Sequence, residues 1–270
     1  MKSLLISWLS RHPFLKHLLR NIRNRLFPGS AVSAHYVTLE GEEKNTEALR
    51  LVNAWQSDLL PQRQRDLVEA QLHKYRAGAR IDVFDVFVQS VRALPQLSAG
   101  MSLLEIGCSS GFYSEVLHIA GLGLTYTGCD YSDAFIQLAR EKYPTIAFDV
   151  EDATALRYPQ DSFDVVVSGC CLLHIPQYAK AIEETARVAR SFAIFHRTPV
   201  VWGQSEQWFR KQAYGVETVE IHFNEPALLQ LFAAHGLHLI ETHTLHEEKQ
   251  DTSGQRGHAV RTYVLSKHHP

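Results

Sequence analysis

The chain has 270 residues, of which 45% are hydrophobic, and its formal net charge is −2 at pH 7. This length allows one large domain, or one domain with an appendage, around a sizeable buried core. The near-neutral charge gives no reason to expect nucleic acid as a partner. No apolar run approaches the roughly 20 residues of a membrane-spanning helix.

The N-terminal segment is basic. It has six Lys or Arg residues and no acid before Glu40, which leaves 21 of the 27 basic residues against 29 acidic residues in the remainder. The apolar stretch Leu4–Leu9 is too short for a signal peptide, so we expect no export and a cytoplasmic protein. From Pro13 onward, apolar residues recur at helical spacing opposite a basic face. The arm 1–28 is expected to pack on its own domain or on a second subunit; the alternative is peripheral contact with the inner face of a membrane.

Helical patterns continue up to Pro95. The expected helices span Glu47–Leu60, Gln62–Tyr75 and Asp82–Leu94. Residues 1–95 are therefore expected to form a helical extension that could act as a lid, and residues 96–270 the main domain.

Strand and helix patterns alternate from residue 101. The apolar runs lack a period of two, as expected for strands that are buried on both faces. The expected strands are Ser102–Ile106, Leu124–Cys129, Thr145–Val150, Phe163–Ser168 and Phe192–Phe195, and the expected helices are Ser110–Ala120, Ala134–Tyr143 and Ala179–Arg190. This alternation predicts an α/β fold with right-handed βαβ units and a parallel sheet covered on both faces.

The pattern loosens after Pro199, in a polar stretch with scattered aromatic residues. A helix is then expected from the N-cap Asn224 to a stop at Gly236. His238–Leu245 and Arg261–Ser266 are expected to be strands that form an antiparallel edge of the sheet.

The turn after the first α/β strand carries the most specific pattern. Gly107 allows a tight turn and close approach of a ligand, and Gly111 allows the next helix to pack against that turn. Glu105 places a carboxylate at the strand end, which suits a cationic ligand better than a pyrophosphate. Asp130 ends the next strand, where an acid can accept hydrogen bonds from both ribose hydroxyls. Asp152 follows the third strand, where a carboxylate can accept a bond from an adenine amino group.

These motifs, LEIGCSSGFYSEVL, TGCDYSDAFIQLAR, VEDATAL and FDVVVSGCCLLHI, resemble those of class I S-adenosylmethionine-dependent methyltransferases of the small-molecule type. The resemblance covers residues 101–200 well and the rest more loosely. It implies a Rossmann-like seven-stranded sheet in the order 3-2-1-4-5-7-6, with strand 7 antiparallel. One departure is Ser109, where the family often has glycine.

The resemblance also implies the cofactor, S-adenosylmethionine, and the residues around it. Glu105, Gly107 and Gly111 would hold its methionine part, with Cys108 in the same turn. Asp130 would hold the ribose, and Tyr131 would lie against the adenine. Asp152 and Ala153 would contact the adenine, and Ser168 to Cys170 would line the pocket near the amino acid.

In such a family the enzyme transfers a methyl group in line to a nucleophile, and a hydroxyl acceptor benefits from a general base. His174 and His196 follow the fourth and fifth strands and are candidates, although each could be a structural histidine. Arg197 could pair with an anionic substrate or with a nearby acid. The aromatic residues Trp202, Trp208 and Tyr214, together with Phe112, Tyr113 and Phe209, could wall the acceptor pocket or belong to the core.

We therefore expect a methyltransferase that acts on an oxygen of a small molecule, a glycan or a lipid-linked acceptor. No metal is expected, because His238, His243 and His246 lack the spacing of a metal site, and the four cysteines have no CxxC pair. The alternatives are a non-catalytic protein that binds the cofactor and a nicotinamide-dependent oxidoreductase. The absence of GxGxxG and the presence of Glu105 disfavour the latter.

Overall fold

The computed structural model describes residues 33–250 and 253–267. The basic arm 1–28 lies outside the described residues. No helix in the described part is long and apolar enough to cross a membrane.

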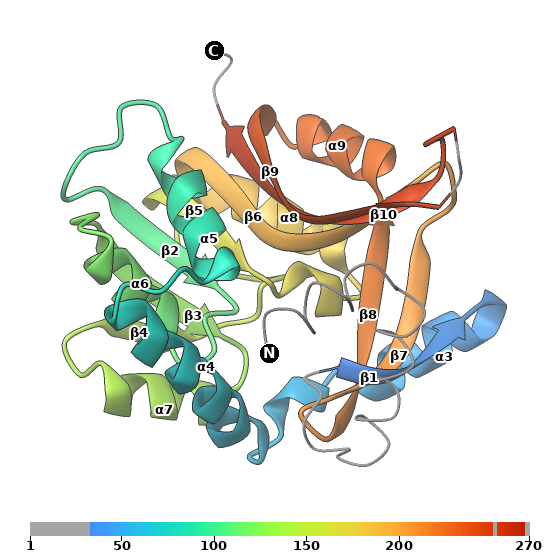
Figure 1. The fold of residues 1–270 in the computed structure, drawn as a ribbon, viewed down its shortest axis with the longest axis horizontal. Coiled ribbons are helices and arrows are strands. Elements are labelled where there is room, and N and C mark those ends of the chain that lie inside the picture. Colours follow the sequence, from blue (N-terminus) through green and yellow to red (C-terminus); the bar gives the residue numbers. More distant parts are fainter. Residues whose placement is uncertain (1–32, 251–252, 268–270) are drawn as a thin grey trace, which may run out of the picture.

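The central sheet has the expected strand order. Its strands run β4-β3-β2-β5-β6-β10-β9, in which β10 is antiparallel to both of its neighbours and the first five strands are parallel. The bounds are β2 (Ser102–Ile106), β3 (Thr125–Asp130), β4 (Ala147–Val150), β5 (Phe163–Gly169), β6 (Ala189–Trp202), β9 (His238–Lys249) and β10 (Gly257–Ser266). When these seven strands alone are numbered along the chain, with β7 and β8 left out, their order is 3-2-1-4-5-7-6. Figure 1 shows the long β6 and β10 side by side.

Helices cover both faces of this sheet because its strands are apolar on both sides. Leu103 and Val165 pack on the face covered by α4 (Leu60–Arg76), α5 (Asp82–Arg92) and α6 (Phe112–Ile119). Phe195, on the opposite face, packs with α8 (Tyr178–Val188) and α9 (Glu225–Ala234). The helix α7 (Asp133–Lys142) packs on Phe148 of β4 through Ile136 and Ala139.

Two sequence signals set the ends of α9. The side chain of Asn224 caps the helix by accepting a hydrogen bond from the Ala227 amide at 3.0 Å. Gly236 follows the helix at a φ of 74°, a left-handed conformation that glycine adopts without strain.

A second, antiparallel sheet was not expected. It consists of β1 (Ser33–Leu39), β7 (Gln207–Ala213) and β8 (Val216–Asn224), and it joins the main sheet where Val200 and Val201 of β6 pair with β8. A strand therefore lies between the arm 1–28 and the first expected helix, where none was expected, and two more lie in the loosely patterned region after Pro199. Strand β6 also continues to Trp202, well beyond the expected end at Phe195. Figure 1 shows β1 and β7 next to α3 (Gly41–Leu51).

A short segment after α3 also differs from the expected helix Glu47–Leu60. The helix α3 ends at Leu51, and a single 3-10 turn, η1 (Ala54–Gln56), follows before α4 begins at Leu60. The segment 52–56 thereby leaves the helical path and reaches the cavity described next.

Candidate cofactor and acceptor site

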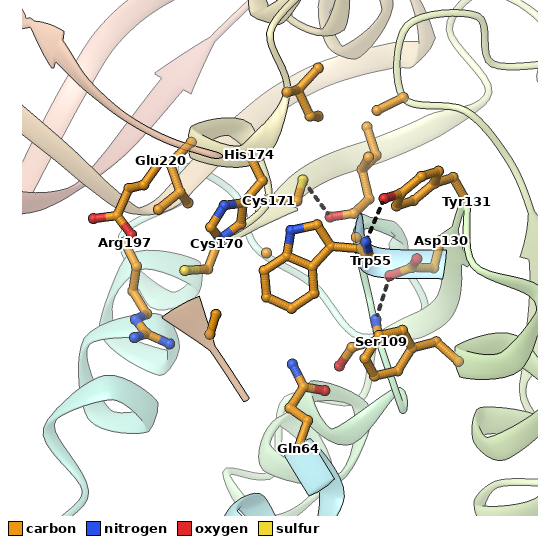
Figure 2. A pocket seen from close by; sticks show the side chains of 18 of the residues that line it. Trp55, Gln64, Ser109, Asp130, Tyr131, Cys170, Cys171, His174, Arg197 and Glu220 are labelled. Carbon is orange, nitrogen blue, oxygen red and sulfur yellow. Dashed lines mark hydrogen bonds between the residues drawn. The ribbon is translucent and has the colours of Figure 1, made fainter. Parts of the chain in front are cut away.

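A cavity of about 470 Å³ lies at the carboxyl ends of the parallel strands. The residues after β2, β3, β4 and β5 line one part of it, and segment 52–56, β7 and β8 complete the wall. Ligands of open α/β sheets bind at this edge. Figure 2 shows Trp55 in the middle, with Asp130 and Tyr131 to one side and His174 and Arg197 to the other.

The glycine-bearing turn needs glycine for steric reasons. Gly107 and Gly111 have φ values of 71° and 72°. A Cβ on Gly107 would collide with the side chain of Cys171, and one on Gly111 would lie 2.6 Å from the ring of Phe148. Ser109 adopts the same left-handed region with a φ of 49°. It therefore keeps the backbone shape that a glycine would give, at a modest cost in strain.

Asp130 is held in place by the backbone. Its two carboxylate oxygens each accept a bond of 3.0 Å, one from the Ser109 amide and one from the Ser132 amide. Burial raises the pKa of Asp130 to about 6, and these backbone N–H groups partly oppose the shift. The carboxylate lines the cavity, as do Gly107, Tyr131, Asp152 and Ala153. These five predicted cofactor residues are thus brought together.

Tyr131 also connects the strand end to segment 52–56. Its hydroxyl donates a hydrogen bond to the carbonyl of Val52 and accepts one from the amide of Trp55, both at 3.1 Å. The cofactor side of the cavity is therefore tied directly to the segment that enters it.

Glu105 lies directly behind the cavity wall. It is 1% exposed, and its carboxylate contacts Gly169, which lines the cavity. The hydroxyl of Tyr126 donates a hydrogen bond to it. Burial raises the pKa of Glu105 to about 8; the Tyr126 bond opposes the shift and the Asp130 charge adds to it. Glu105 is thus poised to ionise when positive charge arrives nearby.

Three other predicted cofactor residues support the wall without lining the cavity. Cys108 is fully buried against Phe148. Gly111 begins α6. Ser168 is buried, with its hydroxyl 3.2 Å from the sulfur of Cys171. Cys170, in contrast, lines the cavity.

His174 occupies the other end of the cavity. Its Nδ1 lies 2.6 Å from the carbonyl oxygen of Val219, so this nitrogen carries the proton and Nε2 is an acceptor. The ring packs against Trp55 with centroids 4.6 Å apart. Burial, with the charge of Lys211 next, lowers the pKa of His174 to about 3, so the ring is neutral at pH 7.

Charged residues from β6, β7 and β8 surround this end. Lys211 and Glu220, which are both buried, form an ion pair. Arg197 and Tyr214 line the same region. Neither Lys211 nor Glu220 was expected in a site, because their strands were not recognised. Trp55 and Gln64 were missed for the same kind of reason, since nothing in their local pattern indicates a cavity.

The structure corrects the expected places of three residues. His196 lies inside β6 rather than in a loop. It is 1% exposed, both ring nitrogens are bonded (to Thr262 and Tyr113), and it does not line the cavity. Trp202 donates its indole N–H to the carbonyl of Gly254, and Trp208 donates to Glu206. Neither tryptophan lines the cavity. Each belongs to a part of β6 or β7 that the sequence pattern did not reveal.

Of the three histidines considered for a metal site, only His246 lies in a group of potential metal ligands among the described residues. His246 lies near Glu248 and His258 on the hairpin of β9 and β10, with their potential ligand atoms within 4.8 Å of one another. His238 and His243 are not part of this group.

Comparison with known proteins identifies a domain within the chain. Residues 104–195 match the model of a methyltransferase domain. The 2-methyl-6-phytyl-1,4-hydroquinone methyltransferase of Synechocystis is 36% identical over 100 residues, which are 36% of this chain and 31% of the relative. The demethylmenaquinone methyltransferase of Renibacterium salmoninarum is 31% identical over 103 residues, or 38% and 41% of the two chains. The matches thus span less than half of these relatives.

A solved structure extends the likeness over more of the fold. The Burkholderia thailandensis 1,6-didemethyltoxoflavin-N1-methyltransferase, solved with 1,6-didemethyltoxoflavin and S-adenosylhomocysteine, superposes with a TM-score of 0.51 at 14% identity. The match covers 87% of this chain and 99% of that one. With the strand order and the glycine turn, these findings show that the chain contains a class I methyltransferase domain, of the family whose cofactor is S-adenosylmethionine.

Proposed function

We propose that this protein transfers the methyl group of S-adenosylmethionine to an oxygen atom of a small molecule, a glycan or a lipid-linked acceptor. The observation that carries the proposal is that a single cavity joins Asp130 and the glycine turn to His174 and Arg197. A donor and an acceptor bound at its two ends would meet in the middle, so that the reaction becomes effectively unimolecular.

The cofactor end has polar groups that could bind a ligand. The hydroxyl of Ser109 lines the cavity and is buried without a hydrogen-bond partner in the described structure. Asp130 offers a carboxylate fixed by two amides, which suits two ribose hydroxyls. Glu105, behind Gly169, can ionise and so become negatively charged when the cationic methionine part binds near it. The residues thus fit S-adenosylmethionine, which when bound supplies an electrophilic methyl group.

At the acceptor end, His174 is the residue that we propose accepts the hydroxyl proton. Its Nδ1–H is fixed by Val219, which leaves Nε2 as the basic atom. A pKa of about 3 makes this a weak base. Transfer from an ordinary phenol, of pKa about 10, would cost roughly 10 kcal/mol at about 1.4 kcal/mol per pKa unit. His174 is therefore suited to orient the hydroxyl and to accept its proton while the oxygen bonds to the methyl carbon and becomes positively charged. It is not suited to ionise the hydroxyl beforehand.

Segment 52–56 is proposed to act as the lid of the cavity. Trp55 packs on His174, and its amide is bonded to Tyr131, so the segment touches both ends of the site. Closure of such a segment excludes water from the reacting atoms. In this proposal, segment 52–56 is the part of the expected N-terminal lid that covers the site.

The two relatives are, by name, methyltransferases of a hydroquinone and of demethylmenaquinone. These acceptors are small and oxygen-bearing, which supports a small-molecule acceptor. A lipid-like acceptor would agree with peripheral membrane contact through the arm 1–28. Loss of liposome binding on deletion of residues 1–30 would support that contact, and unchanged binding would contradict it.

The decisive experiment supplies cofactor with a labelled methyl group to the protein and a whole-cell extract, and partitions the products between water and organic solvent. At a limiting cofactor concentration, label is expected in one of the phases and should be strongly reduced with the Asp130→Ala variant. The organic phase would indicate a lipid-like acceptor and the aqueous phase a polar one. Binding of S-adenosylhomocysteine without any transfer would contradict the proposal and indicate a non-catalytic cofactor-binding protein.

A further inference from the structure

The acceptor end of the cavity contains an arginine that lacks an acidic partner. Five arginines in the described chain are buried or half-buried: Arg65, Arg187, Arg197, Arg210 and Arg261. Four of them form ion pairs with glutamates. Arg197 forms none with any described residue, although it lines the cavity. Its guanidinium does interact with the neutral hydroxyl of Tyr113. A charge kept inside a protein without an opposite charge is costly, so a site that retains one indicates a ligand that supplies the opposite charge.

The strand is built to direct Arg197 into the cavity. Along the pairing of β6 with β10, Phe195 opposes Tyr263 and Thr198 opposes Arg261, so two residues of β6 face the single residue Thr262. This is a β-bulge, a device that re-aims a side chain next to functional sites. The hydroxyl of Thr262 accepts a hydrogen bond from the Arg197 amide at 3.3 Å and fixes the bulge.

Backbone strain is concentrated around the same guanidinium. Cys170, Arg197 and Tyr214 have φ values of 65°, 57° and 50°, and all three line the cavity. Each left-handed residue other than glycine costs about 1 kcal/mol or more, and such residues gather where function requires an unusual direction. Three such residues around one charge therefore indicate a functional site.

The other charges at this end already balance. Lys211 and Glu220 form a buried pair, so Arg197 leaves an excess of one positive charge. The indole N–H of Trp55 is also buried without a partner in the described structure, and Trp55 lines the same cavity. A cation and a neutral donor both call for ligand oxygens. One unpaired cation matches a single negative charge and not the double charge of a phosphate monoester.

We propose that the methyl acceptor carries a singly charged oxyanion, a carboxylate or an ionised enol, that pairs with the guanidinium of Arg197. This inference rests on the methyltransferase function proposed above. It places the anion at the far end of the cavity from Asp130 and leaves a second oxygen of the acceptor for His174 and the methyl group.

The first test uses acetate and its neutral counterpart acetamide as probes, at constant ionic strength and with S-adenosylhomocysteine bound. We expect acetate to bind at least about 10-fold more tightly than acetamide, measured by tryptophan fluorescence. Arg197→Gln should abolish the preference and Arg197→Lys should keep part of it. Arg261→Gln, which alters a paired arginine outside the cavity, should leave it unchanged. Equal binding of the two probes, or a preference that survives in Arg197→Gln, would overturn the inference.

The second test uses the natural acceptor. Extract is divided at pH 7 on an anion exchanger, and each fraction is incubated with methyl-labelled cofactor. We expect label only with the retained, anionic fraction, and a KM for it that rises at least about 10-fold in Arg197→Gln while S-adenosylhomocysteine binds as before. Label in the unretained fraction would refute the anionic acceptor and leave methyl transfer intact. No label in any fraction would refute methyl transfer, and the acetate test would still decide the role of Arg197.

Discussion

Replacement of Glu105 by glutamine should affect stability and cofactor binding in opposite directions. In the cofactor-free protein the Glu105 carboxyl has a pKa of about 8, whereas the ordinary value is 4.5. At pH 7 it is therefore protonated when the protein is folded and ionised when it is unfolded. Unfolding then releases a proton, so rising pH favours unfolding by about 1.4 kcal/mol per pH unit between these two pKa values.

Glutamine has nearly the same shape but no proton to release. Relative to wild type, Glu105→Gln should therefore gain about 2.5–3 kcal/mol of unfolding free energy between pH 5.5 and pH 7.5. Other titrating groups, including Asp130 and the buried histidines, contribute equally to both proteins and cancel in the difference. The free energies would be measured by urea unfolding followed by tryptophan fluorescence. A difference between the proteins that stays constant with pH would refute the reasoning.

The same carboxyl should report on the cofactor. A cationic ligand near Glu105 favours its ionised form, so binding of S-adenosylmethionine near pH 7 should release up to about one proton. Calorimetry in two buffers with different ionisation enthalpies measures this release. Glu105→Gln should bind the cofactor more weakly and release fewer protons. Proton release equal to that of wild type would mean that another group senses the cofactor charge.

Three further substitutions test the site and its frame. Asp130→Ala should weaken S-adenosylhomocysteine binding by roughly 1.5–3 kcal/mol, by calorimetry, because charge-assisted hydrogen bonds are lost; unaltered affinity would place the ribose elsewhere. Gly111→Ala should lower the unfolding free energy by about 2 kcal/mol or more, since its Cβ would lie 2.6 Å from the Phe148 ring; wild-type stability in urea would contradict this steric account. Asn224→Ala should cost about 1 kcal/mol in the same assay through loss of the α9 cap, which Asn224→Ser should largely retain; equal losses in both variants would exclude capping as the cause.

The parallel part of the fold could be predicted because its signals are local. Buried strands such as Phe163–Gly169 lack alternation, and Gly107 and Gly111 mark the turn at the ligand-binding edge. Asp130 could be placed in the cavity because carboxyl ends of neighbouring parallel strands meet at one edge. The family resemblance supplied the antiparallel last strand, which local patterns alone only suggested.

The antiparallel sheet could not be predicted, since its signals depend on partners far away in the chain. Lys211 is buried in β7 because Glu220 of β8 neutralises it, whereas a lysine in an isolated pattern indicates an exposed position. Strand β1 pairs with β7 across more than 160 residues of sequence. The acceptor end was consequently only partly predicted. His174 and Arg197 follow from the predicted parallel strands, and Tyr214 was named only as one of several scattered aromatic residues. Trp55 enters from the N-terminal extension and was not predicted.

The bulge at His196 and Arg197 also determines which face of the sheet each later side chain of β6 points to. Side chains of a strand alternate between faces, so the extra residue decides which of Pro199 to Trp202 point inward. Val200 and Val201 then carry β8, and through it β7 and β1. Deletion of one residue at the bulge would therefore move each side chain in the outer half of β6 to the opposite face. The strands β8, β7 and β1 would then pair with a strand whose side chains point the wrong way. The direction of Arg197 and the position of that sheet thus both depend on the number of residues in β6.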